Sequence, residues 1–92
     1  MQKPSLGRIV IVPVDPARNN GGTEAPAVIT RAFSDTMINV RVLLDGREVD
    51  WLTSVSLYAT PEDLTAARVQ RDKEMPHAAG TPMHGAYWPP RV

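Results

Sequence analysis

The segment "MINVRVLLDGREVDWLTSVSLY", residues 37–58, most constrains the fold of this 92-residue chain. Over residues 37–44, apolar side chains occupy every second position, which is typical of a half-buried antiparallel strand. Asp45 and Gly46 follow, and a glycine accepts the positive φ that a tight turn between two strands needs. Residues 49–58 then form the return strand. The segment therefore predicts a β-hairpin with a short turn at residues 45–46.

The two-residue period of a strand also assigns the side chains of the return strand to faces. One face is expected to hold Trp51, Thr53, Val55 and Leu57, and the other Leu52, Ser54, Ser56 and Tyr58. This interpretation places the tryptophan on the same face as two aliphatic residues.

Three further strands are expected from short β-branched or aromatic runs: "GRIVIVPV" (7–14), "AVITRAF" (27–33) and "AYWP" (86–89). The segment "TPEDLTAARVQRDKE" (60–74) changes to a helical pattern, with Thr60 as the N-cap and Pro61 at the first helical position. Leu64 and Ala67 give this helix a thin apolar stripe, so it needs a surface to pack on.

Five short strands in a chain of this length favour a barrel, because closure removes the exposed edges of an open sheet. The predicted fold is an all-β, five-stranded antiparallel barrel with one short helical insertion. It forms one domain, residues 1–92, since a second domain would leave each half too small for a core.

The charge balance limits the classes of partner. Ten basic and ten acidic residues cancel, so the chain lacks the positive field that general nucleic-acid binders and anionic-membrane binders use. The apolar run near the N-terminus is too short to span a bilayer, which predicts a cytoplasmic protein. The sequence has no cysteine and no catalytic motif, and His77 and His84 lack a carboxylate at ligand spacing. We therefore expect no enzyme activity, cofactor or metal.

The order of motifs is similar to that of a family of small uncharacterised proteins from actinobacterial phages and prophages. The resemblance rests on "GRIVIVPV", "APAVITRAF", "VLLDG", "SVSLY" and the closing "GAYWPPRV". Family members usually begin Gly-x-Ile-Val and end on a Gly-aromatic-Trp-Pro segment. The resemblance implies an SH3-like barrel and a phage origin, but no chemistry. The resemblance does not extend to residues 60–84, where this sequence predicts a helix and a loop and many family members have only a short acidic linker.

The terminal segment supplies the first candidate ligand-binding residues. Neighbouring side chains of a strand face opposite ways, so Trp88 is expected to be largely buried while Tyr87 faces a ligand or partner. Arg91 would add one positive charge. The alternative is that Trp88 fills the barrel floor and Tyr87 covers an edge.

Arginine residues supply the remaining candidates. The loop "ARNNGG" (17–22) could hold an anion on its backbone amides, aided by Arg18, or it could be a flexible hairpin connection. Arg31, Asn39 and Arg41 project from the second and third strands, where two guanidinium groups could grip a phosphate. The alternative is pairing of these arginines with Asp35, Glu48 or Asp50.

These features give two functional hypotheses. The first is a non-enzymatic phage accessory protein that forms a homo-oligomer and sequesters a small anionic ligand, plausibly a nucleotide immune signal, in the host cytoplasm. The second is a structural or adaptor module that binds a protein or peptide partner through an aromatic groove.

Overall fold

The computed structural model describes residues 3–78 and 84–90. The order of its elements is β1 (Ile9–Pro13), η1 (Pro16–Arg18), β2 (Glu24–Ala32), β3 (Met37–Leu43), β4 (Val49–Tyr58), α1 (Pro61–Glu74), η2 (Pro76–Ala78) and β5 (Gly85–Tyr87). All five predicted strands and the predicted helix are present. Thr60 caps α1 as expected, because its hydroxyl accepts a hydrogen bond from the Asp63 amide at 3.2 Å.

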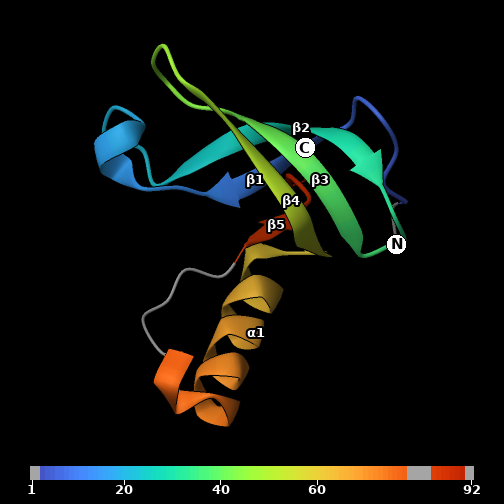
Figure 1. The fold of residues 1–92 in the computed structure, drawn as a ribbon, viewed down its shortest axis with the longest axis vertical. Helices are drawn as coiled ribbons and strands as arrows, with labels where there is room; N and C mark the ends of the chain where they lie inside the picture. The colour runs from blue at the N-terminus through green and yellow to red at the C-terminus, as the bar shows by residue number, and fades with distance from the viewer. Residues whose placement is uncertain (1–2, 79–83, 91–92) are drawn as a thin grey trace.

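The five strands form a closed barrel in the order β1-β2-β3-β4-β5, and α1 extends away from one end of it (Figure 1). The prediction of a purely antiparallel sheet is wrong, since β4 and β5 pair in parallel. The reason is the connection between them: residues 59–84 include α1, and a crossover of this length returns the chain in the same direction. The structure is thus a small mixed barrel, mostly strands, with one helix.

The core is aliphatic and lies inside the barrel. Alternate residues of β3 point inward, as the sequence predicts, and they meet inward residues of every other strand. The core cluster consists of Val10, Val12, Ala25, Ala27, Ile29, Ile38, Val40, Val42, Leu44, Val55, Leu57, Ala86 and Trp88. Trp88 is its large aromatic member, which confirms the expectation that this ring is largely buried.

The β3–β4 hairpin is present, but its connection is longer than a two-residue turn. β3 ends at Leu43 and β4 begins at Val49, so residues 44–48 form the loop. Gly46 does not have a positive φ, and a Cβ built on it would meet no atom within 4 Å. The expectation that Gly46 is required by a tight turn is therefore wrong, because the longer loop relaxes the backbone demand at this position.

A β-bulge in β4 changes which side chains face the core. Val40 pairs with Leu52 and Ile38 pairs with Val55, so β4 has one more residue than β3 over this interval. The bulge contains Ser54, whose φ is 56°. The predicted strict alternation is therefore wrong: Leu52 packs against the core together with Val55, and Trp51 turns outward.

Helix α1 packs on the outer face of β5 through its buried residue, Leu64, which is 3% exposed. The contact is close, because a Cβ built on Gly85 would lie 2.4 Å from a Leu64 methyl carbon. The absence of a side chain at position 85 thus lets the helix approach the strand. Val69, further along α1, is exposed.

This contact predicts that two glycine substitutions differ in their effect on stability. Gly85→Val should lower the free energy of unfolding by about 1–3 kcal/mol, because the new methyl groups overlap Leu64. Gly46→Val, the matched control in open space, should change it by less than about 0.5 kcal/mol. Urea unfolding of both variants tests the difference, and equal losses would contradict the helix contact.

Candidate functional site

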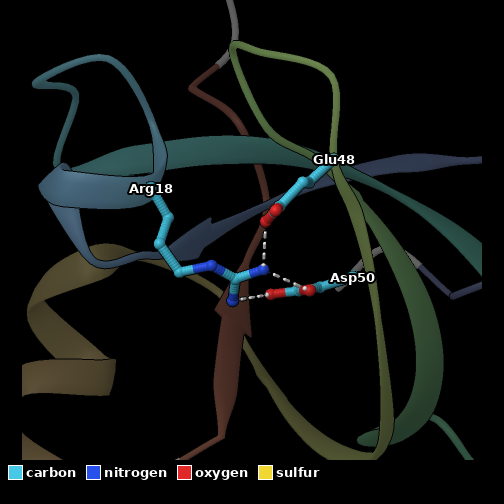
Figure 2. Close-up of polar contacts among 3 residues, drawn as sticks. All are labelled: Arg18, Glu48 and Asp50. Carbon is cyan, nitrogen blue, oxygen red and sulfur yellow. Dashed lines mark hydrogen bonds and ion pairs between the residues drawn. The ribbon is translucent and has the colours of Figure 1, made fainter.

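Arg18, a predicted anion ligand, is engaged by two carboxylates (Figure 2). Its guanidinium donates to Asp50 at 2.7 and 2.9 Å and to Glu48 at 2.8 Å. These carboxylates raise the pKa of Arg18 above its usual value, the Asp50 hydrogen bond being the main cause. The group ties the η1 loop to the β3–β4 hairpin. An anion at Arg18 would have to displace two carboxylates, so the structure does not favour the predicted anion site.

The neighbouring Asn19 makes this loop an ordered part of the fold rather than a flexible connection. Its side-chain amide donates to the carbonyls of Gly22 and Glu24, both at 3.1 Å, and its Oδ1 accepts from the Asp45 amide at 2.6 Å. Asn19 is 4% exposed. Gly22 leaves room for it, since a Cβ at position 22 would lie 2.7 Å from the Asn19 side-chain nitrogen.

Asn39 also has a structural partner. Its Oδ1 accepts a hydrogen bond from the Ser54 amide at 2.9 Å, and the residue is buried at the bulge. This bond satisfies a backbone donor that the bulge removes from the ladder. Asn39 is therefore not presented beside the two arginines as a ligand group.

The two strand arginines remain exposed on the outer side of the barrel. Arg31 pairs with Asn39 in register, and its guanidinium lies 4.9 Å from the centroid of the Phe33 ring. Neither Arg31 nor Arg41 has an ion pair with a described residue, so the alternative in which they pair with Asp35, Glu48 or Asp50 is wrong. Arg91 lies outside the described residues.

Tyr87 and Trp88 face opposite sides of the chain, as strand alternation predicts. Trp88 packs in the core, and the Arg8 guanidinium lies 5.1 Å from its ring centroid. Tyr87 is nevertheless only 6% exposed, so the expectation that it faces a ligand is wrong. It shares the outer face of β5 with Gly85, on which α1 packs, and its hydroxyl donates to the Glu24 carboxylate. This bond links β5 to β2 across β1.

A different set of residues forms an outward, mostly apolar surface that the strand register defines. Ile9 of β1 pairs with Val28 of β2, Val28 pairs with Arg41 of β3, and Arg41 pairs with Trp51 of β4. We call this row and the adjacent pair Leu43 and Val49 the outer face. Trp51 is 56% exposed, and Ile9, Leu43 and Val49 are also exposed.

Sequence reasoning missed Trp51 because a bulge moves it to the other face of its strand. The signal was the spacing of Leu52 and Val55, which are three residues apart and separated by the polar pair Thr53 and Ser54. Two apolar residues at this spacing can both face a core only if the strand contains an extra residue.

No protein-family model, curated protein or solved structure matches this chain. Among the described residues, the structure has no group of three or more potential metal-ligating His, Cys, Asp or Glu side chains. No helix within residues 3–78 and 84–90 is long and apolar enough to cross a membrane.

The first prediction for this region concerns Asn19. Asn19→Ala should lower the free energy of unfolding by about 1–3 kcal/mol, because the Asp45 amide and two carbonyls lose the buried Asn19 side chain as their partner. Asn20→Gly is the matched control: it removes one exposed contact of 3.3 Å to Asp45 and relieves the positive φ of 49°. The control should unfold within about 0.5 kcal/mol of the wild type. Similar losses in both variants would contradict the anchoring role of Asn19.

The second prediction concerns Tyr87. Burial, helped by the Glu24 bond, raises its pKa from 10 to about 12. Because the folded pKa is the higher one, folding favours the neutral phenol, and this stabilisation is complete below pH 10 and lost as the pH rises through 12. Tyrosinate absorbance should show a late titration step that is absent in Tyr87→Phe. Stability should also fall less steeply with pH above 10 in that variant, and an unchanged titration curve would contradict the assignment.

Proposed function

We propose that this chain is a non-enzymatic, SH3-like binding module that recognises a protein or peptide partner through its outer face. The observation that carries the proposal is the exposed indole of Trp51, which lies opposite the exposed Arg41 in a row that continues through Val28 to Ile9. Tryptophan and arginine are the side chains that most often dominate binding energy at protein interfaces.

The outer face combines the two properties that a partner surface needs. Contiguous apolar side chains on four neighbouring strands provide area that leaves water on binding. Arg41 provides a charge that selects orientation and partner. These residues lie on paired strands, where the backbone is already held by ladder hydrogen bonds, so few groups lose freedom when a partner binds.

A second candidate is the sequestration of a small anionic ligand, such as a nucleotide, by an oligomer of a phage-encoded protein in the host cytoplasm. The observation that favours it is the cross-strand pair of Arg41 and Trp51, which could hold a phosphate and stack on a base. Its phage setting rests on the terminal motifs. A nucleotide at a hundredfold its dissociation constant should stabilise the chain by about 2.7 kcal/mol.

A selection from a displayed random peptide library on the immobilised chain tests the main proposal. Enriched peptides should bind Trp51→Ala at least about tenfold more weakly, because the indole is the largest exposed side chain of the face. Val69→Ala removes an exposed apolar side chain from α1 and is the matched control, which should bind as the wild type does.

Two results would contradict the main proposal. One is enrichment of peptides whose affinity is the same for Trp51→Ala and the wild type. The other is the absence of any enriched peptide. If a nucleotide then raises the melting temperature and Arg41→Ala abolishes that shift, the results favour the second candidate.

A further inference from the structure

The barrel has an unpaired strand edge beside Trp51. β3 pairs along one edge of β4, from Val49 to Ser56, while β5 pairs along the other edge only from Ser56 to Tyr58. The second edge of β4 therefore has no strand partner over residues 49–55 among the described residues. The register pairs of β1 among the described residues are with β2 and β5, and none is with β4.

A short stretch of this edge, residues 51–53, lacks the features that usually block pairing. Natural edges carry charges, prolines or bulges that prevent another strand from adding. Here Arg18 with its two carboxylates covers the end at Glu48 and Asp50 (Figure 2). The bulge at Ser54 ends the regular strand. Between them, Trp51 and Thr53 are exposed. In an antiparallel pair, every second residue of a strand directs its N–H and C=O away from the partner strand. Alternate residues of this stretch of β4 therefore present these groups at the free edge.

The charges next to this edge favour one kind of occupant. Arg31 and Arg41 project from the outer side of β2 and β3, and neither has an ion pair with a described residue. Glu24 places a carboxylate at an outward position of β2, and this carboxylate accepts a hydrogen bond from the Tyr87 hydroxyl. The outward side of β2 and β3 is therefore basic although the chain is neutral, and the carboxylates at the end of the edge, Glu48 and Asp50, are paired with Arg18. A second copy placed there by a two-fold axis would bring like charges together, whereas a carboxylate would complement Arg41.

We infer that the partner is an extended acidic segment of another protein, which adds as a strand to the free edge of β4 over residues 51–53. This inference rests on the proposed function and specifies its partner. Backbone hydrogen bonds to β4 hold the added strand. Its outward side chains pack on Trp51, and a glutamate or aspartate side chain reaches across to Arg41, two strand spacings or roughly 9.5 Å away.

The test uses an acidic peptide from the library selection described above, together with its lysine-substituted counterpart. Arg41→Glu should weaken the acidic peptide at least about tenfold and should strengthen the lysine counterpart. Lys73→Glu makes the same charge change on α1, which projects away from the sheet, and should alter neither affinity by more than about twofold (Figure 1).

Backbone pairing is tested separately. Bound peptide should slow hydrogen exchange at alternate amides of residues 51–53, and N-methylation of alternate peptide amides should cost at least about tenfold in affinity. Peptides that need Trp51 but protect no β4 amide would overturn strand addition and leave the proposed function intact. Failure to enrich any peptide would overturn both. Selected peptides without acidic residues, or a dimer of the chain that already protects these amides, would overturn the acidic partner.

Discussion

The hydrogen bond from the Ser54 amide to the Asn39 side chain anchors the bulge on which the two faces of the sheet depend. The bulge lets Leu52 and Val55 both face the core although they are three residues apart. Ser54 has a positive φ, which for a residue with a Cβ costs on the order of 1 kcal/mol. Burial of Val55 and Leu52, together with the Asn39 bond, offsets that cost. The same shift turns Trp51 outward, so one polar contact in the sheet determines where the indole lies.

Several polar residues have the chemistry of ligand-binding groups, but in this structure they connect strand ends and loops. Arg18 and Asn19 join the η1 loop to the β3–β4 hairpin, and Tyr87 joins β5 to β2. The physical reason is the size of the barrel. A small core leaves many loop amides and carbonyls near the surface, and side chains from distant segments satisfy them. Such groups carry the same chemistry as a binding site, and their partners come from distant parts of the sequence.

Local patterns predicted the elements well, because their causes are local. The alternation of β3, the cap at Thr60 and the proline after it each depend on residues a few positions apart. The direction of β5 and the covering of Tyr87 depend instead on where α1 returns the chain. The prediction of an antiparallel sheet did not take into account that a connection as long as residues 59–84 permits a parallel pair. The candidate site was predicted least, since the exposure of Trp51 follows from a bulge that strict alternation does not allow.

The outer face stays exposed because α1 covers only a small part of the sheet. Its buried residue, Leu64, is near its N-terminus and fits the surface where Gly85 has no side chain. The rest of the helix extends past the end of the barrel and leaves β1, β2 and β3 uncovered (Figure 1). A helix with a longer apolar stripe, lying across the strands, would have hidden Val28 and Trp51. Scattered exposed apolar side chains are ordinary, but a contiguous row that ends in a tryptophan is typical of a surface with a partner.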